Sequence, residues 1–319
     1  MSILITGAAG FIGSHLVDTL LLANESIIGI DSFNNYYSPS IKENNLKEAK
    51  KNSNFKLITG SILDTHLLDT IFKNNTITKI IHLAAYAGVR PSIENPDIYY
   101  ETNITGTKNI LESAKKYQCK RVLVASSSSV YGNNKKIPFS ETDPVDNPIS
   151  PYAATKKMSE IMCYNYHYLY NLDIACLRFF TVYGPRQRPE MAIHKFCNMI
   201  THNQPIPVYN HGKCLRDYTY IDDIINGVVN ILKSPNLSFD IINLGESATI
   251  STNDLILLLE KELSTKASIT YLDSQQGDVE QTFADITLAK TKYNYNPKFP
   301  LETGLKQFVN WYQSLNHCA

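Results

Sequence analysis

Three residues in the middle of the chain have types and a spacing suited to proton transfer. Tyr152 is followed four positions later by Lys156, and Ser127 lies twenty-five positions before the tyrosine. Ser150 can cap a helix in which Pro151 takes the first position, so Tyr152 and Lys156 would share one helical face. An ammonium group beside a phenol favours the phenolate and lowers the phenol pKa from about 10 toward neutral pH. The pattern therefore predicts that Tyr152 acts as a general base.

The serine belongs to a run of hydroxyl residues that ends an apolar segment, Val122 to Tyr131. If the strand continues, alternation places Ser127 and Ser129 on one face and Ser126 and Ser128 on the other. Two hydroxyls on one face could bind a substrate oxygen and relay its proton. Two simpler interpretations stay open: a serine run is typical of a turn, and an isolated Tyr-x-x-x-Lys spacing occurs in helices that only pack a tyrosine and extend a lysine to solvent.

A glycine-rich turn near the start of the chain indicates a nucleotide cofactor. Gly7, Gly10 and Gly13 follow a short apolar segment and precede helical apolar spacing over Phe11 to Leu22. Such a turn lets backbone N–H groups approach a pyrophosphate at a helix N-terminus. Asp31, at the end of the next apolar segment, could accept both ribose hydroxyls and would repel a 2′-phosphate, which favours NAD over NADP. The alternatives are a simple tight turn and an aspartate that caps a turn.

Short apolar segments alternate with helical ones in the first half of the chain. Six of them are expected to be strands: Ile3 to Ile5, Ile27 to Ile30, Phe55 to Ile58, Lys79 to Leu83, Arg121 to Ala125 and Ile174 to Arg178. This alternation is typical of right-handed β-α-β units and predicts an α/β fold with a Rossmann-type, doubly wound parallel sheet.

The alternation breaks near Gly184, where Gly, Pro and Arg crowd together. Shorter elements follow, with strands expected at Ile206 to Tyr209 and Asp240 to Asn243 and helices at Ile221 to Leu232, Thr252 to Leu263 and Leu301 to Leu315. We expect a cofactor-binding domain over residues 1–184 and, mainly over 185–319, a smaller C-terminal substrate-binding lobe, some of whose elements could return to the sheet.

The composition favours a small-molecule partner in a reducing compartment. Thirty basic and thirty acidic residues cancel, so no long-range field would collect nucleic acid or an anionic membrane. No apolar run approaches the roughly 20 residues of a spanning helix. Six cysteines lie scattered without a Cys-x-x-Cys pair, at positions 119, 163, 176, 197, 214 and 318. We expect a soluble, cytoplasmic protein with reduced thiols and no metal.

These motifs together resemble the extended short-chain dehydrogenase/reductase family, specifically its nucleotide-sugar epimerases and dehydratases. The resemblance runs from about Ile3 to Trp311. Besides the glycine turn, Asp31 and the Ser/Tyr/Lys set, it rests on four further motifs: His82-Leu-Ala-Ala85, Asn103 within Thr-Asn-Ile-Thr-Gly-Thr, Leu177-Arg-Phe-Phe-Thr-Val-Tyr-Gly-Pro185 and Leu215-Arg-Asp-Tyr-Thr-Tyr-Ile-Asp-Asp223.

The resemblance implies a reaction at C4 of the sugar of a UDP-sugar. Tyr152 would remove the 4-OH proton while the C4 hydride passes to a tightly held NAD, and the 4-keto sugar would turn over and take the hydride back on its other face. Ser127 would be the hydroxyl partner of Tyr152, and Lys156 would bridge the nicotinamide ribose. Arg216 would grip the diphosphate, as suits a guanidinium fork, although a surface ion pair with Asp217 is the open alternative.

The resemblance also implies two sets of binding residues and no metal site. The cofactor set is Gly7, Gly10, Phe11, Ile12, Gly13, Asp31, Ser32, Asn34, Ser61, Ile62, Leu83, Ala84, Ala85, Asn103, Tyr152, Lys156 and Phe179. The substrate set is Arg90, Ser127, Ser128, Ser129, Tyr152, Thr181, Arg188, Val208, Arg216 and Asp278.

The choice of sugar rests on details of these motifs. Family dehydratases and decarboxylating synthases carry carboxylates where this chain has Ser128 and Ser129, which leaves 4-epimerisation as the simplest chemistry. Among the family's epimerases, the segments 31–39, 87–96 and 188–192 and Thr181 most resemble those that act on UDP-glucuronate. The 4-keto form of glucuronate is a β-keto acid, so its carboxylate must be held, and Arg188, Thr181 and the serines could hold it.

Two departures and three alternatives accompany this hypothesis. Arg186-Gln187 replaces the aromatic-Gly usual in glucuronate epimerases, and Ser61 replaces an Asp that commonly contacts the adenine region. An epimerase of UDP-glucose or UDP-N-acetylglucosamine, a reductase that releases NADH and a non-catalytic NAD-binding sensor are the other functions; a sensor would not need the Tyr/Lys/Ser set. The resemblance further implies a homodimer formed by helices around Asp97 to Lys116 and Pro151 to Tyr170.

Overall fold

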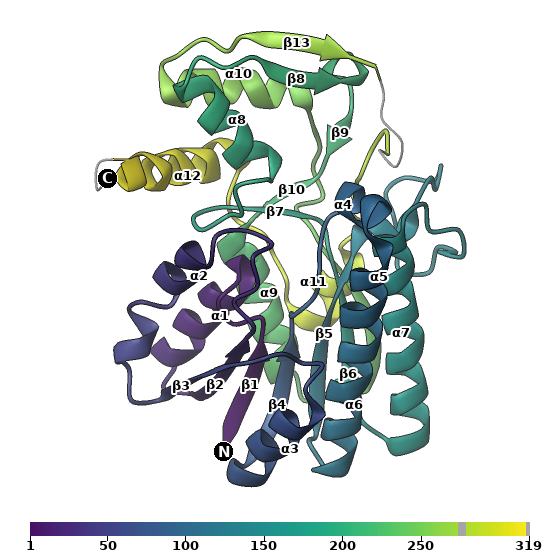
Figure 1. The fold of residues 1–319 in the computed structure, drawn as a ribbon. Helices are drawn as coiled ribbons and strands as arrows, with labels where there is room; N and C mark the ends of the chain where they lie inside the picture. Colours follow the sequence, from purple (N-terminus) through teal and green to yellow (C-terminus); the bar gives the residue numbers. More distant parts are fainter. Residues whose placement is uncertain (274–278, 317–319) are drawn as a thin grey trace. The chain divides into compact units, whose positions relative to one another are not determined.

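The computed structural model describes residues 1–273 and 279–316, which form two compact units (Figure 1). Unit 1 comprises residues 1–133, 141–179 and 228–242, and unit 2 comprises 134–140, 180–227 and the chain from 243 onward. One boundary between the units, after residue 179, lies near residue 184, and the chain passes between the units at four further points, after residues 133, 140, 227 and 242. Residues 134–140 belong to unit 2 because Phe139 N–H donates to Phe283 O and Phe139 O accepts from Asp285 N–H.

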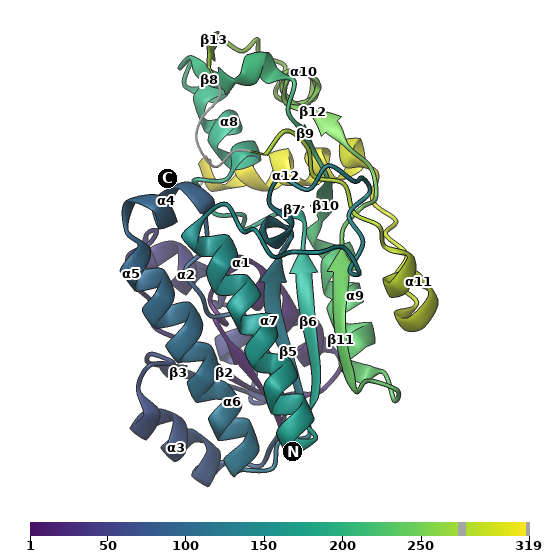
Figure 2. The same ribbon diagram turned by 90° about the vertical axis from the view of Figure 1, so that its right-hand side faces the viewer.

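Unit 1 is built on a seven-stranded sheet with the order β11-β6-β5-β4-β1-β2-β3. Its strands are β1 (Ser2–Thr6), β2 (Ser26–Asp31), β3 (Phe55–Thr59), β4 (Ile77–His82), β5 (Arg121–Ser127), β6 (Asp173–Phe179) and β11 (Phe239–Leu244). The pairs from β3 to β6 are all parallel. The six predicted strands and the parallel α/β sheet are thus confirmed. The strand predicted over Asp240 to Asn243 is confirmed as β11, and it returns to this sheet beside β6 (Figure 2).

Helices cover both faces of this sheet. They are α1 (Phe11–Leu22), α2 (Pro39–Asn45), α3 (Thr65–Asn74), α4 (Val89–Glu94), α5 (Pro96–Tyr99), α6 (Thr107–Lys116), α7 (Pro151–Tyr170) and α9 (Ile221–Lys233), with short turns η1 (Ala49–Lys51), η2 (Tyr100–Gly106) and η3 (Ser128–Tyr131). Figures 1 and 2 show α3, α6 and α7 along one face and α1 and α9 along the other. Buried side chains of α3, α6 and α7 form one apolar core with those of the strands.

Unit 2 consists of small sheets and helices. The parallel pairs are β7 (Thr181–Tyr183) with β10 (Tyr218–Tyr220) and β8 (Ile206–Tyr209) with β13 (Ile269–Leu272), and the antiparallel pair is β9 (Leu215–Arg216) with β12 (Ile250–Ser251). The helices are α8 (Ala192–Thr201), α10 (Thr252–Leu263), α11 (Thr287–Tyr293) and α12 (Leu301–Asn316), with the turn η4 (Asn210–Gly212). The predicted strand at 206–209 and the three predicted C-terminal helices are confirmed.

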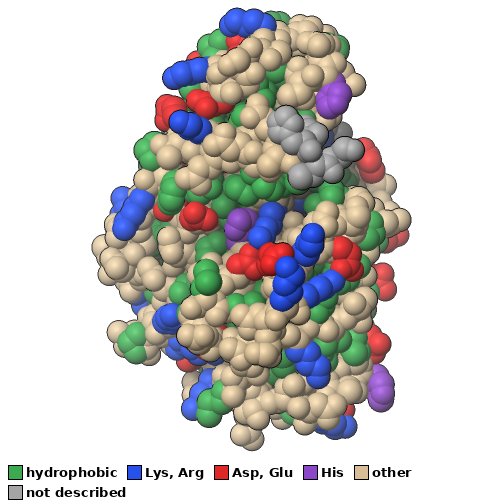
Figure 3. All heavy atoms as spheres, turned by 90° about the vertical axis from the view of Figure 1, so that its left-hand side faces the viewer, with side chains coloured by type: hydrophobic (Ala, Val, Ile, Leu, Met, Phe, Trp, Pro, Cys, Tyr) green, Lys and Arg blue, Asp and Glu red, His purple; other side chains and the backbone are tan. Residues whose placement is uncertain are grey.

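The surface carries charges of both signs. Figure 3 shows Lys and Arg side chains interspersed with Asp and Glu on the face that it displays, in agreement with the zero net charge. Among the described residues, no helix combines the length and apolarity that a membrane crossing requires. No group of three or more His, Cys, Asp or Glu side chains in this part of the chain is placed to bind a metal ion.

Candidate active site

The glycine turn between β1 and α1 leaves no room for a side chain at Gly7 or Gly13. Gly7 has a φ of +69°, which favours glycine, and a Cβ there would lie 2.9 Å from Ala84 N. A Cβ on Gly13 would lie 2.1 Å from Gly7 O. Helix α1 begins at Phe11 after Gly10, so the first-turn amides, including that of Ile12, point out of the helix end. This bare backbone edge fits the pyrophosphate of a dinucleotide.

Asp31 ends β2 next to this turn and is buried. Its Oδ2 accepts from Ala9 N–H at 3.0 Å and its Oδ1 accepts from Phe33 N–H at 2.9 Å. Each carboxylate oxygen can accept a second hydrogen bond, so the aspartate caps the turn and still has acceptor capacity for ribose hydroxyls. Ser32 is exposed, whereas the Oδ1 and backbone O of Asn34 both accept from the Lys42 ammonium.

His82, at the end of β4, is hydrogen-bonded to Thr6 at the end of β1 and to Thr107 at the start of α6. The donor and acceptor in each of these bonds can be assigned. Thr107 Oγ1 donates to Asn103 O, so it must accept from His82 Nε2–H at 3.0 Å. His82 Nδ1 then accepts from Thr6 Oγ1 at 2.7 Å, and Thr6 Oγ1 accepts from Ala84 N–H at 3.1 Å. Burial, and secondarily the positive charge of Lys156, lowers the pKa of His82 to about 3, so the ring is neutral.

Asn103 lies in the π-helical turn η2 that precedes α6, and its amide is engaged by the protein. Asn103 Oδ1 accepts from Tyr86 N–H at 2.8 Å, and Nδ2 donates to Tyr86 O and to Thr155 Oγ1, both at 3.0 Å. Thr155 Oγ1 in turn donates to Tyr152 O at 2.8 Å. Both amide hydrogens are therefore used within unit 1, and Asn103 holds the segment after β4 against helix α7.

The remaining predicted cofactor residues also lie in unit 1. Ser61 Oγ accepts from Leu63 N–H, and Ile62 is buried after β3. Leu83 and Ala85 are half-buried just past β4, and Phe179 is the buried last residue of β6. All of these positions follow the carboxyl ends of parallel strands, where doubly wound folds bind ligands.

The predicted acid–base residues lie at the start of α7. Ser150 caps the helix by accepting from Ala153 N–H, and Pro151 takes its first position, as predicted. Tyr152 N–H donates to Ser92 Oγ at 3.1 Å. The Lys156 Nζ lies 5.9 Å from the centre of the Tyr152 ring and donates to Ala125 O at 2.8 Å. Burial lowers the pKa of Lys156 to about 8.

The serine segment is part strand and part turn. Strand β5 ends at Ser127, and the next residues form the 3₁₀ turn η3, so the predicted strand alternation is wrong beyond Ser127. Ser127 and Ser129 nevertheless meet, because the turn brings their hydroxyls to 3.1 Å and Ser129 N–H donates to Ser127 Oγ. Ser126 points the other way, where its hydroxyl donates to Glu160. Ser128 is half-buried in the turn.

Unit 2 holds most of the other predicted substrate residues. The backbone N–H of Thr181, in β7, donates to Asp217 O. Thr181 therefore lies beside Asp217, which directly follows Arg216 in the sequence. The Arg216 guanidinium donates to Leu215 O at 2.9 Å and to Glu280 O at 3.4 Å. The alternative interpretation of Arg216, a surface ion pair with Asp217, is wrong, because Asp217 is fully buried and accepts from the backbone N–H groups of 246, 247 and 284. Burial raises the pKa of Asp217 to about 6.

Arg188 follows β7 in a loop, where its Nε lies 2.9 Å from Glu190 Oε1. Val208 is completely buried in β8. In unit 1, Arg90 is exposed on α4. Asp278, which the resemblance placed in the substrate set, lies outside the described residues.

Several polar residues around the site were missed by the sequence analysis. Glu160 and Arg178 form a buried ion pair behind the serine segment, and Ser92 supports the start of α7. Two signals were present in the sequence. Glu160 continues the four-residue spacing of Tyr152 and Lys156, and Arg178 is a charged residue that directly follows the apolar run 174–177.

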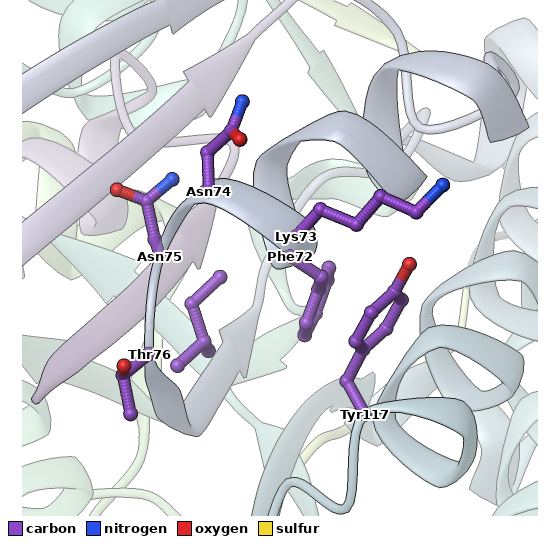
Figure 4. Close-up of a pocket in the computed structure, with 7 residues that line it drawn as sticks. Phe72, Lys73, Asn74, Asn75, Thr76 and Tyr117 are labelled. Atoms are coloured by element: carbon purple, nitrogen blue, oxygen red, sulfur yellow. The ribbon is translucent and has the colours of Figure 1, made fainter.

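A pocket of about 310 Å³ elsewhere in unit 1 is unrelated to this site. It lies at the end of α3 and the start of β4, where Phe72, Lys73, Asn74, Asn75, Thr76, Ile77 and Tyr117 line it (Figure 4). It is thus at the amino edge of the sheet. The ammonium group of Lys73 and the hydroxyl of Tyr117 both contact Asp69, so these two polar groups of its wall are already paired.

Comparisons with known proteins agree over nearly the whole chain. The family described as GDP-mannose 4,6 dehydratase matches residues 4–308. The chain is 45% identical to a UDP-glucuronate 4-epimerase of Thermodesulfobacterium geofontis, over 97% of this chain and 95% of the relative. A Bacillus cereus UDP-glucuronic acid 4-epimerase in complex with UDP-glucuronic acid and NAD superposes with a TM-score of 0.93 and 37% identity, covering 99% and 100% of the two chains. A Thermotoga maritima UDP-glucose 4-epimerase with UDP-glucose superposes with a TM-score of 0.91 and 31% identity, with the same coverage.

Proposed function

The chain belongs to the family described as GDP-mannose 4,6 dehydratase, and from that membership we propose that it is an NAD-dependent 4-epimerase of a UDP-sugar. UDP-glucuronate is the preferred substrate and UDP-galacturonate its product. The relatives and solved structures named above, which include both a glucuronate and a glucose epimerase, support the reaction type more strongly than the choice of sugar.

One observation carries the proposal: a single unit contains both the bare glycine turn and the Tyr152, Lys156 and Ser127 side chains at the same edge of its sheet. A sensor of NAD would need only the turn. NAD, when bound, would accept the C4 hydride and return it. We assign its binding to the glycine turn, Asp31 and the small residues after β4.

The residues of α7 and β5 supply the proton chemistry. Tyr152 accepts the proton of the sugar 4-OH as the C4–H bond breaks, and it returns that proton after the 4-keto sugar has presented its other face. The Lys156 ammonium, 5.9 Å from the centre of the phenol ring, stabilises the phenolate. The Ser127 hydroxyl donates to Ser129 Oγ at 3.1 Å in the structure, and with substrate bound it would turn to donate to the sugar oxygen instead. The Ser129 N–H, which donates to Ser127 Oγ, would hold it in place.

The absence of carboxylates at Ser128 and Ser129 favours epimerisation over dehydration, because removal of a C5 proton needs a stronger base than an alcohol. Arg188 and Thr181 are assigned to the glucuronate carboxylate, and Arg216 is assigned to the diphosphate. The assignment of Arg188 and Thr181 separates the proposal from the alternative, an epimerase of UDP-glucose or UDP-N-acetylglucosamine.

Proton NMR of the products tests the proposal. Purified protein is incubated in turn with UDP-glucuronate, UDP-glucose and UDP-N-acetylglucosamine, and the anomeric signals of the starting and product sugars are followed. We expect UDP-galacturonate to form fastest. Faster conversion of UDP-glucose would support the rival epimerase, and a stoichiometric release of NADH would support a reductase.

We also propose a homodimer in the cytoplasm. Apolar and aromatic side chains of α7 are exposed, among them Ile161 at 59%, Tyr164 at 54% and Tyr168 at 75%, more than a helix that only covers a sheet requires. The cytoplasmic location is proposed from the scattered spacing of the cysteines, which favours a reducing compartment. Light scattering should report a dimer at micromolar concentration, and Ile161→Glu should shift it toward monomer; a wild-type monomer would contradict the pairing.

A further inference from the structure

A buried ion pair lies directly behind the serine segment. Glu160 is on α7, one turn after Lys156, and Arg178 is on β6. Arg178 Nε donates to Glu160 Oε1 at 2.8 Å and Arg178 Nη2 donates to Glu160 Oε2 at 2.9 Å, so the contact is bidentate. Glu160 is only 2% exposed and Arg178 only 1%.

Each partner of this pair has a further hydrogen bond to one end of the serine segment. Ser126 Oγ donates to Glu160 Oε1 at 2.6 Å. Arg178 Nη1 donates to the Tyr131 hydroxyl at 2.9 Å, and the guanidinium carbon lies 4.8 Å from the centre of the Tyr131 ring. Ser126 and Tyr131 immediately flank residues 127–130, so the ion pair fixes both ends of the segment that carries Ser127 and Ser129.

The same helix face carries the catalytic groups. Tyr152, Lys156 and Glu160 follow one another at four-residue intervals on α7. Lys156 contacts Ala125 O and Glu160 contacts Ser126, so α7 is fastened to two successive residues of β5. The position of the Ser127 hydroxyl relative to the phenol of Tyr152 is therefore set by contacts on the opposite side of the segment.

A gain in the stability of the fold does not explain why the core contains this buried ion pair. Two charges taken out of water lose their hydration, and well-packed apolar side chains of similar volume often stabilise a core equally well. A bidentate pair in which every partner is hydrogen-bonded does, however, define the relative position of the elements that it joins.

We propose that Glu160 and Arg178 are positioning residues for the reaction: through Ser126 and Tyr131 they hold Ser127 and Ser129 in the geometry that hydrogen-bonds the reacting sugar oxygen. This inference rests on the proposed function. It predicts that loss of a contact to the ion pair slows the chemical step, while substrate binding and the fold are retained.

Two variants that each remove one hydroxyl group test the inference without removing a charge. Ser126→Ala deletes the contact to Glu160, and Tyr131→Phe deletes the contact to Arg178 while keeping the ring. For each, kcat and KM with UDP-glucuronate are measured together with the melting temperature. We expect kcat to fall at least fivefold in each variant, with KM within about twofold of the wild-type value and a melting temperature within a few degrees of it.

The chain offers a matched control on the same two strands. Arg121 in β5 and Asp173 in β6 pair at 3.3 Å at the opposite end of these strands. Asp173→Asn removes this ion pair far from the serine segment, and we expect its kcat to remain at the wild-type value. The double variant Glu160→Met/Arg178→Met tests the buried pair itself and should fold with a kcat lowered more than that of either single variant. If it does not fold, the two hydroxyl variants decide.

The results separate this inference from the proposed function. An active wild type whose Ser126→Ala and Tyr131→Phe variants keep kcat within twofold would overturn the inference alone. A decrease in kcat that is proportional to a decrease in melting temperature would also overturn it. So would an equal decrease in kcat in the control variant Asp173→Asn. A wild type that epimerises no UDP-sugar would overturn the proposed function and this inference with it.

Discussion

Replacement of Arg188 should remove most of the preference for a uronic acid. Arg188→Met deletes the guanidinium but keeps an apolar side chain in the loop after β7. In the structure the guanidinium lies 2.9 Å from Glu190, and the two side chains are 23% and 41% exposed. Binding of a substrate carboxylate by Arg188 must therefore compete with an ion pair that already exists.

The size of the effect follows from these two interactions. A charge-assisted hydrogen bond contributes about 1.5–3 kcal/mol. A solvent-exposed ion pair that it replaces contributes up to about 1 kcal/mol. If the ion pair contributes the full amount of about 1 kcal/mol, the net benefit for glucuronate is about 0.5–2 kcal/mol, which corresponds to roughly 2- to 30-fold in kcat/KM. A neutral hydroxymethyl group on the substrate gains none of this.

The assay compares kcat/KM for UDP-glucuronate and UDP-glucose on three proteins: wild type, Arg188→Met and Glu190→Gln. We expect the ratio of the two kcat/KM values to fall by roughly 2- to 30-fold in Arg188→Met. Glu190→Gln should raise the ratio, because the substrate carboxylate no longer has a competitor. Equal losses on both substrates in Arg188→Met would refute this reasoning and assign Arg188 to the diphosphate.

Three other outcomes are expected. Tyr152→Phe should lower kcat by about 10²- to 10⁴-fold, with little change in melting temperature or in substrate Kd measured by calorimetry, and activity within a few fold of wild type would make Tyr152 structural. The apoenzyme should bind NAD more tightly than NADP in a fluorescence titration, because Asp31 repels a 2′-phosphate, and Asp31→Asn should narrow that difference. The pKa of His82 is lowered to about 3 from an unfolded value near 6.5, so its neutral form contributes stability above pH 6.5 that is lost as the pH falls toward 3. The free energy of unfolding should fall by up to about 1.4 kcal/mol per pH unit in that window, and a His82→Gln variant with the same slope would contradict this origin.

The sequence was sufficient to predict the parts of the fold that depend on local patterns. The apolar segments gave the strands of unit 1, and the Ser150 and Pro151 signals placed the start of α7 correctly. These features depend on periodicity and on capping, both of which act over a few residues. The same local signals explain why the C-terminal helices were predicted within one residue of their observed ends.

Features that depend on pairing between distant segments could not be predicted in this way. The strand pattern of β11 did not reveal that its neighbour would be β6. The serine run did not decide between a continued strand and a turn, because alternation and a 3₁₀ turn both bring Ser127 and Ser129 together. The bond between Ser126 and Glu160 joins residues thirty-four positions apart, and only the packing of α7 on β5 creates it.

The fate of a C4 deuterium label tests the central claim most directly. The claim is that Tyr152, Lys156 and Ser127 support a reversible oxidation at C4, so the hydrogen that leaves C4 must return to the same carbon. UDP-glucuronate deuterated at C4 is incubated with the purified protein in ordinary water, and the product is analysed by NMR and mass spectrometry. We predict UDP-galacturonate that retains the deuterium at C4 throughout the approach to equilibrium. Loss of the label to solvent, or no galacturonate product at all, would contradict the account.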